Sequence, residues 1–130
     1  MLKQDLKNLR YLEKEIKRLE ERIEELESAV QKLTSKNDGM PRGGSLDLMK
    51  EELIDQKTVL EHKRWELVLL KAETERTLNE LDDSLLRLIL TKRYIDGKTW
   101  AAVAIEIGGG NTEESVKMME YRFFKKIDNW

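Results

Sequence analysis

Apolar residues in the first quarter of the chain recur at alternating spacings of three and four, the pattern of a helix with one narrow apolar stripe. No proline or glycine interrupts positions 2–36, so a helix over residues 1–36 is predicted. β-Branched residues fill most of one repeating position and leucine the other, which favours two-stranded coiled coils. Because so narrow a stripe must be buried against another helix, its members are candidate oligomerisation residues. They are Leu9, Leu12, Ile16, Leu19, Ile23, Leu26, Val30 and Leu33.

The segment 37–45 holds the only proline of the chain and three of its seven glycines, and it is predicted to be a loop. Ser45 is the expected N-cap of a second long helix over 46–81. Apolar residues again recur three or four apart in this helix, but Gln56, Lys63 and Thr74 interrupt the stripe. The loop is long enough for the two helices to fold back as an antiparallel hairpin. An extended coiled coil between two chains fits the same pattern, so both arrangements stay open.

The segment 82–130 differs in character, because six of the eight aromatic residues lie from Tyr94 onward. Asp82 or Asp83 is predicted to cap a helix that Asp96-Gly97 ends, and Thr99 to cap a short helix over 100–107. Three consecutive glycines form a turn, after which Asn111 or Thr112 caps a last helix to about residue 127. The buried stripe of this last helix is expected to be Val116, Met119, Phe123 and Ile127, widened by Phe124.

The predicted fold is therefore all-α: a long helical hairpin or coiled coil followed by a small C-terminal helix-turn-helix domain over 82–130. A three-helix cap without any ligand is the simpler alternative for the same pattern. Composition agrees, since 38% of the 130 residues are charged and one is a proline, a balance typical of long solvated helices.

Several function classes are not expected. The chain has no cysteine, and it contains no apolar run near the ~20 residues that span a membrane. No signal peptide is recognisable, so a cytoplasmic location is expected. His62 is the only histidine, and Gly108 to Gly110 lack the preceding strand and following lysine of a phosphate-binding loop. We expect no catalytic residues, metal or cofactor.

Several stretches of this C-terminal part resemble region 4 of sigma-70-type factors. They are Leu85-Leu86-Arg87-Leu88, Arg93-Tyr94 and Gly97-Lys98-Thr99-Trp100-Ala101-Ala102-Val103-Ala104. The last helix follows the region 4 recognition-helix pattern without gaps. The matching positions are Thr112, Glu114, Val116, Lys117, Met119, Glu120, Arg122, Phe124, Lys126 and Ile127. The chain is more similar still to small phage transcriptional regulators of the ArpU and RinA type, which place such a module after a helical N-terminal part.

The resemblance implies a DNA-binding transcriptional regulator of a bacteriophage or prophage, such as a late-gene activator, acting in the bacterial host cytoplasm. It also implies that the last helix enters the major groove of double-stranded DNA and that RNA polymerase is a possible partner. Early exposed positions would face bases, and later basic ones would contact phosphates. The candidate DNA-binding residues are Lys98, Thr99, Thr112, Glu113, Ser115, Lys117, Met118, Tyr121, Arg122, Lys125 and Lys126.

The sequence departs from region 4 in two respects. Glu113 and Ser115 stand where that region usually has arginines, and the turn is about two residues longer. From residue 82 on, eight Lys and Arg are balanced by eight Asp and Glu, so an isolated module is expected to bind DNA weakly. Dimerisation would raise the affinity, because two linked modules gain roughly 10²–10⁴ in avidity. We therefore expect a homo-oligomer.

Two other functions use the same parts. One is a protein-interaction module that binds RNA polymerase, a sigma factor or a host defence protein and does not read DNA sequence. The other is a small packaging protein that oligomerises and holds DNA. The neutral charge balance and Glu113 favour the interaction module, whereas the gapless last helix favours DNA.

Overall fold

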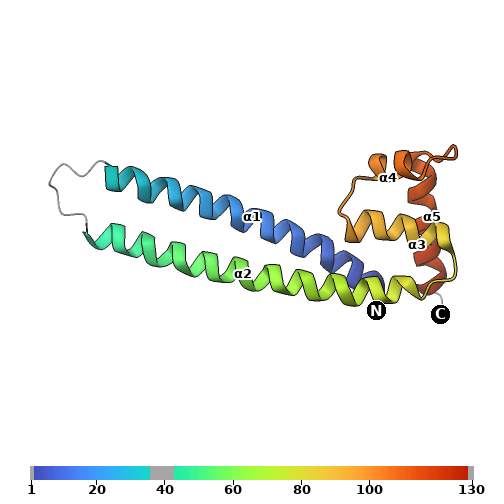
Figure 1. The fold of residues 1–130 in the computed structure, drawn as a ribbon, viewed down its shortest axis with the longest axis horizontal. Helices are drawn as coiled ribbons and strands as arrows, with labels where there is room; N and C mark the ends of the chain where they lie inside the picture. Colours follow the sequence, from blue (N-terminus) through green and yellow to red (C-terminus); the bar gives the residue numbers. More distant parts are fainter. Residues whose placement is uncertain (1, 36–42, 129–130) are drawn as a thin grey trace. The chain divides into compact units, whose positions relative to one another are not determined.

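The computed structural model describes residues 2–35 and 43–128, and every regular element in these two ranges is helical. The elements in chain order are α1 (Leu2–Ser35), α2 (Gly43–Asn79), α3 (Ser84–Leu90), the π-helical turn η1 (Thr91–Ile95), α4 (Trp100–Ile107) and α5 (Glu113–Asp128) (Figure 1). This confirms the all-α class with a long pair of helices first. The chain divides into two compact units, one from Tyr11 to Val68 and the other containing the residues up to Arg10 and from Leu69 onward.

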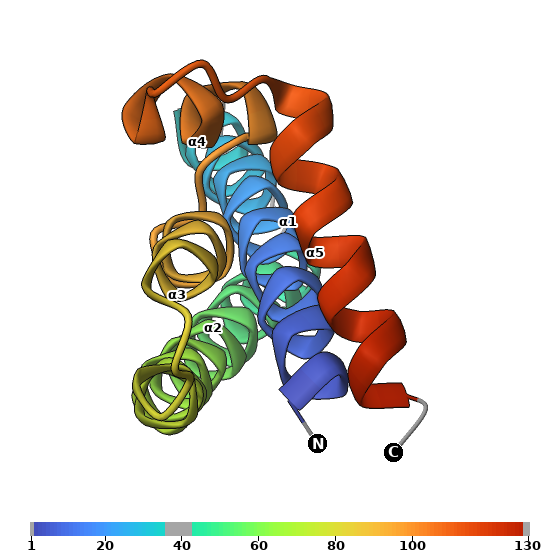
Figure 2. The same cartoon turned by 90° about the vertical axis from the view of Figure 1, so that its right-hand side faces the viewer.

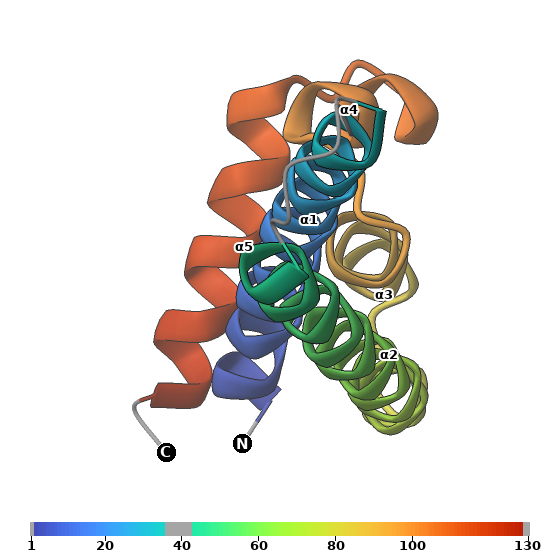
Figure 3. The same cartoon turned by 90° about the vertical axis from the view of Figure 1, so that its left-hand side faces the viewer.

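The unit Tyr11–Val68 is an antiparallel pair made of α1 and α2, which lie side by side in Figure 3. Cross-helix ion pairs show that the helices run in opposite directions. A glutamate early in α1 pairs with a lysine late in this part of α2, and a glutamate later in α1 pairs with an earlier lysine of α2. The pairs are Glu15–Lys63 at 2.9 Å, Glu20–Arg64 at 3.6 Å and Glu27–Lys57 at 4.0 Å. The hairpin is thus the arrangement found. Most of the predicted loop, residues 37–42, lies outside the described residues.

The stripe predicted to join two chains is covered within one chain instead. Five of its members are less than 9% exposed: Leu9, Leu12, Ile16, Ile23 and Leu26. The other three, Leu19, Val30 and Leu33, are half-buried. The fold already removes five of these side chains from water and covers the other three in part, so their role as oligomerisation contacts stays a prediction.

The start of α2 also differs from the prediction. The helix begins at Gly43, so Ser45 lies inside its first turn and is not the N-cap. The physical reason is that a helix, once nucleated, extends by one or two residues at little cost, so the preference of Ser45 for the cap position does not fix where α2 begins. Two of the polar residues that interrupt the stripe differ in how they are satisfied. Lys63 keeps its ammonium group on the Glu15 carboxylate, and this hydrogen bond raises the pKa of Lys63. Thr74 is buried, and its hydroxyl has no hydrogen-bond partner among the described residues.

The α2 helix of this hairpin carries a second, exposed apolar face. Ile54 and Trp65 are each 63% exposed and Val68 is 56% exposed. Their spacings of eleven and three residues place all three on one side of the helix. Apolar residues on two faces explain why the sequence of α2 shows a less regular stripe than that of α1.

The second unit contains a three-helix core at which α3, α4 and α5 meet (Figure 2). Ile89 of α3, Val103 and Ala104 of α4, and Val116 of α5 are at most 5% exposed. Trp100, Ile107 and Met119 pack around them. The predicted stripe of the last helix is confirmed for Val116, and Phe124 is also buried at 8% exposure. The other members, Met119, Phe123 and Ile127, are half-buried.

The first turns of α1 belong to this second unit and not to the hairpin. Leu6 and Leu9 have no exposed surface, and the Lys3 ammonium lies 5.9 Å from the centre of the Phe124 ring on α5. Leu78 of α2 is likewise fully buried. The compact unit therefore includes chain well before residue 82, where composition alone placed the boundary.

The predicted caps and turn can be assigned to single residues. Asp83, not Asp82, caps α3 by accepting from the Leu86 amide at 3.2 Å, and Thr99 caps α4 through the Ala102 amide at 3.2 Å. Gly108, Gly109 and Gly110 have φ values of 65°, 63° and 80°, a region that glycine enters without the cost a Cβ imposes. The turn is held by the Asn111 side-chain amide, which donates to the Gly108 carbonyl at 2.9 Å.

Candidate nucleic-acid interface

The helices α4 and α5, joined by the three-glycine turn, form the candidate site. Along α5, Met118, Tyr121 and Lys125 follow one another at spacings of three and four, so they share one face. Met118 is 44% exposed and Tyr121 is 57% exposed, and the Lys125 ammonium lies 5.9 Å from the centre of the Tyr121 ring. We call these three side chains the outward face of α5. It turns away from the core stripe of Val116 and Phe124.

Three of the predicted DNA contacts serve as helix caps. The Ser115 amide donates to the Thr112 hydroxyl at 3.1 Å, and the Thr112 amide donates to the Ser115 hydroxyl at 2.8 Å. This reciprocal arrangement resembles a capping box, with serine in the place of the usual Glu or Gln. It assigns the cap to Thr112 and not to Asn111. Since the Thr99 hydroxyl caps α4 in the same manner, these three residues have a structural explanation that requires no DNA.

Two of the predicted lysine contacts are neutralised by carboxylates. Lys117 pairs with Glu113 one turn earlier at 3.0 Å. Lys98 pairs closely with Glu106, which also lies 3.6 Å from Lys92. The hydrogen bond from Lys98 lowers the pKa of Glu106, so this carboxylate stays ionised beside both lysines. The positive potential that a phosphate would meet at α4 and early α5 is reduced accordingly.

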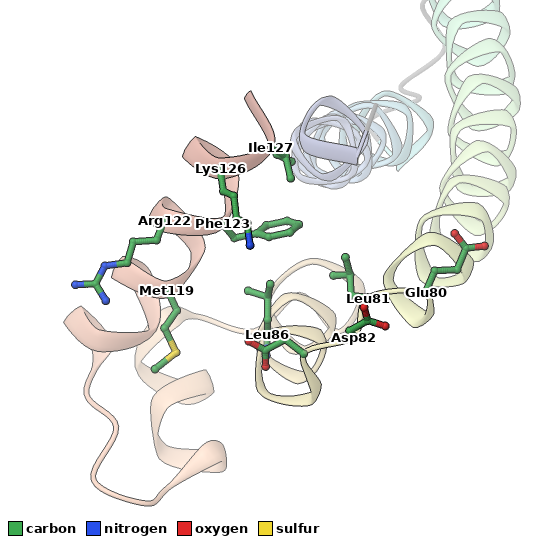
Figure 4. A pocket seen from close by; sticks show the side chains of 10 residues that line it. Glu80, Leu81, Asp82, Leu86, Met119, Arg122, Phe123, Lys126 and Ile127 are labelled. Carbon is green, nitrogen blue, oxygen red and sulfur yellow. The ribbon is translucent and has the colours of Figure 1, made fainter. Parts of the chain in front are cut away.

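Lys126 lies about 100° around α5 from Lys125, because the two are adjacent in the sequence, and Arg122 lies one turn before Lys126. Arg122 and Lys126 both line a groove of about 580 Å³ (Figure 4). Its other lining residues are Glu80, Leu81, Asp82, Asp83, Leu86, Met119, Phe123 and Ile127. Arg122, Lys125 and Lys126 were all predicted as phosphate contacts, but Arg122 and Lys126 line the groove whereas Lys125 does not. The acidic side of the groove was not predicted.

A half-buried hydrogen bond joins η1 to α5 behind the outward face. The Tyr94 hydroxyl donates to the Glu120 carboxylate at 2.8 Å. Burial raises the pKa of Glu120, although the Tyr94 hydrogen bond and the nearby Arg93 and Arg10 act in the opposite direction. Burial and the adjacent carboxylate also raise the pKa of Tyr94. The residue types were visible in the sequence, but they lie 26 positions apart and no pattern connects them.

The Glu120→Gln variant is expected to be more stable than the parent chain at pH 7. The raised pKa of Glu120 means that the folded state favours the neutral acid. The stabilisation that the neutral acid gives to the folded state is fully present below the unfolded pKa of about 4.3, and it is lost as the pH rises through the folded pKa. Glutamine is neutral at every pH and keeps an oxygen for the Tyr94 hydroxyl. Urea unfolding between pH 4 and pH 8 measures the difference, which should vanish at the acid end.

A matched variant, Tyr94→Phe, removes the donor without changing the shape of the ring. It is expected to lower the free energy of unfolding by about 1–3 kcal/mol at pH 7, because the carboxylate loses its hydrogen-bond donor. Equal stabilities of the Glu120→Gln variant and the parent at pH 7 would contradict the account of Glu120.

Among the described residues, no three His, Cys, Asp or Glu side chains are grouped so that they could hold a metal ion. None of the described helices is long and apolar enough to cross a membrane. Comparisons of the chain with protein-family models, with curated proteins and with solved structures give no match.

Proposed function

We propose that this chain binds double-stranded DNA through the outward face of α5 and acts as a transcriptional regulator. The observation that supports the proposal is the three-helix arrangement of α3, α4 and α5 around one core, with Met118, Tyr121 and Lys125 of α5 left exposed. In helix-turn-helix proteins the second helix of the pair lies in the major groove, and the first supports it. Here α4 and α5 are that pair.

Each side chain of the outward face has a contact suited to its chemistry. Met118 is apolar and exposed, so it suits a thymine methyl group in the major groove. Lys125, near the end of α5, suits a phosphate, and Tyr121 beside it offers a hydroxyl to the same backbone. Glu114, one turn before Met118, accepts hydrogen bonds and suits a cytosine amino group.

Binding by one copy is expected to be weak. Lys98 and Lys117 are paired with carboxylates, and non-specific affinity depends mainly on phosphate neutralisation. Two copies on one duplex would compensate through avidity. The resemblance to phage regulators extends the proposal to promoters at which the chain activates late genes by touching RNA polymerase.

A second candidate function is a protein-interaction module that does not read DNA. The observation in its favour is that the same two lysines are neutralised within the fold. Fragmented phage and host DNA, captured on the full chain at low and at physiological salt, separates the two candidates. Enrichment of one short site that survives physiological salt supports the regulator. Recovery of no DNA, or of random fragments that salt removes, supports the interaction module, and RNA polymerase is then the first partner to test.

The Lys125→Gln variant is expected to weaken DNA binding and to reduce the slope of log affinity against log salt by about 0.9, the value for one lost phosphate contact. The reason is that Lys125 is the cation of the outward face and pairs with no carboxylate among the described residues. Fluorescence anisotropy with a labelled duplex, repeated at several salt concentrations, measures the slope.

Lys126→Gln is the matched control, since it removes the same charge from the next residue but on the groove side of α5. Measured on a short duplex that holds one copy, so that association of copies does not contribute, it is expected to leave the salt slope unchanged. A slope that falls with Lys126→Gln and not with Lys125→Gln would place the phosphate contact on the groove side of α5 and not on the outward face.

A further inference from the structure

The groove between α5 and the segment 80–86 has an apolar floor. Leu81 and Leu86 line it from one side, and Met119, Phe123 and Ile127 from α5 (Figure 4). All five are only half-buried in the single chain. Covering the groove would therefore remove further apolar surface from water, which is favourable in proportion to the area buried.

The two rims of the groove carry opposite charges. Glu80 and Asp82 lie on one rim, and Arg122 and Lys126 lie on the other. All four side chains are exposed, and none of the ion pairs between described residues joins one rim to the other. The charges are thus available to a partner that enters the groove.

The acidic rim is held in place before any partner arrives. The Arg87 guanidinium donates to the Leu81 carbonyl and, at 2.9 Å, to the Ser84 hydroxyl. The Leu81 amide donates to the Leu78 carbonyl at 3.1 Å. These hydrogen bonds order the link between α2 and α3, so little conformational entropy remains to be lost there on binding.

We propose that the groove binds a second copy of this chain, so that two copies associate about a two-fold axis with their grooves face to face. A two-fold interface brings the same patch of both copies together. With the axis along the groove, the residues on one rim of one copy face the residues on the other rim of its partner. The Glu80 and Asp82 rim of each copy then faces the Arg122 and Lys126 rim of its partner. The apolar linings of the two grooves then face each other between the rims.

The charges on the two rims favour a second copy of this chain as the occupant of the groove. A nucleic acid is uniformly negative and would be repelled by the acidic rim, and a partner of either single charge would meet one unfavourable rim. A surface that is acidic on one side and basic on the other is complementary to itself under two-fold rotation. The inference goes beyond the proposed function and also serves it, since paired copies carry two α5 helices while Lys125 stays outside the groove.

Exchange of charges between the rims tests the proposal without DNA, so its outcome is independent of whether the chain binds DNA. The first variant makes both rims acidic, with Arg122→Glu and Lys126→Glu. The second makes both rims basic, with Glu80→Lys and Asp82→Lys, and leaves Asp83 to cap α3. Light scattering and sedimentation equilibrium over a range of concentrations give the mass in solution.

The parent chain is expected to reach twice the mass of one chain, and each variant alone to stay at the mass of one chain. An equimolar mixture of the two variants should recover the double mass, because acidic rims then face basic rims on both sides. Lys125→Glu, a charge reversal on the outward face, should leave the dimer intact. Circular dichroism melting checks that each variant folds. If a double variant does not fold, the single change on the same rim, Lys126→Glu or Glu80→Lys, replaces it.

Three results would overturn the proposal. One is a parent chain that stays at single mass at every concentration, which would leave the groove open to a different protein. Another is a dimer that persists in both variants, which would place the interface elsewhere, for example on the exposed face of α2 with Trp65. The third is a mixture of the variants that stays at single mass.

Discussion

Replacing Leu6 with alanine is expected to lower the free energy of unfolding by about 2–5 kcal/mol, the cost of truncating a fully buried leucine. Leu6 lies in the second turn of α1 and has no exposed surface. The side chain is buried in the unit that contains α5, where Lys3 lies against the Phe124 ring. Chemical unfolding followed by circular dichroism measures the loss. Hydrogen exchange should show faster opening of α5 than of the hairpin 11–68.

Leu33→Ala is the matched control, because Leu33 lies near the other end of α1, is half-buried and belongs to the hairpin. A smaller loss is expected there, and α5 should keep its protection. If Leu6→Ala left α5 fully protected, the first turns of α1 would not be part of the C-terminal unit. A chain shortened to residues 69–130 would then fold by itself, whereas we expect it to be largely unfolded.

Trp100→Ala is expected to lower the free energy of unfolding by about 3 kcal/mol, within the range for truncating a large aromatic side chain. The indole packs on the core formed by Ile89, Val103 and Val116. Its ring also lies 4.8 Å from the Arg93 guanidinium, a cation–π contact of about 0.5–2 kcal/mol. Thermal melting followed by near-ultraviolet circular dichroism should show that the aromatic environment of the C-terminal unit is lost at a lower temperature.

Trp100→Phe keeps an aromatic ring in this position and is expected to cost less than Trp100→Ala. DNA binding by the alanine variant, measured well below its melting temperature, should weaken together with the fraction of folded protein, because Trp100 supports α4 and is not on the outward face of α5. An unchanged melting temperature in Trp100→Ala would show that the half-buried indole contributes little to the core.

The regular elements could be predicted because local rules dominate them. The heptad stripe of α1, the caps at Thr99 and Asp83, and the core position of Val116 all follow from spacings of a few residues or from side chains that satisfy nearby amides. The same rules fail at Ser45, where a good capping residue lies inside a helix that begins two positions earlier. Local preferences there are too small to determine the first turn.

Much of the candidate site could not be predicted, because its residues are distant in the sequence. The groove joins Glu80 and Asp82 to Arg122 and Lys126 across about forty positions. The Tyr94–Glu120 hydrogen bond likewise links η1 to α5. The separation of Lys125 from Lys126 could have been derived from the helical period, but only the structure shows that one side of α5 borders a groove.

From the order of its residues alone, the chain could be predicted to be helical, with helix bounds correct to within a few residues and with the apolar face of each helix known. Those features depend on periodicity and on backbone capping, both of which act within one or two helical turns. Three features emerged only from the folded chain: most of the α1 stripe from Leu12 to Leu26 is buried in a hairpin with α2, Leu6 and Leu9 belong to the unit of α5, and Lys126 but not Lys125 borders the groove. The physical reason is that an apolar stripe specifies that it must be buried but not against which surface, since hydrophobic burial has no direction of its own.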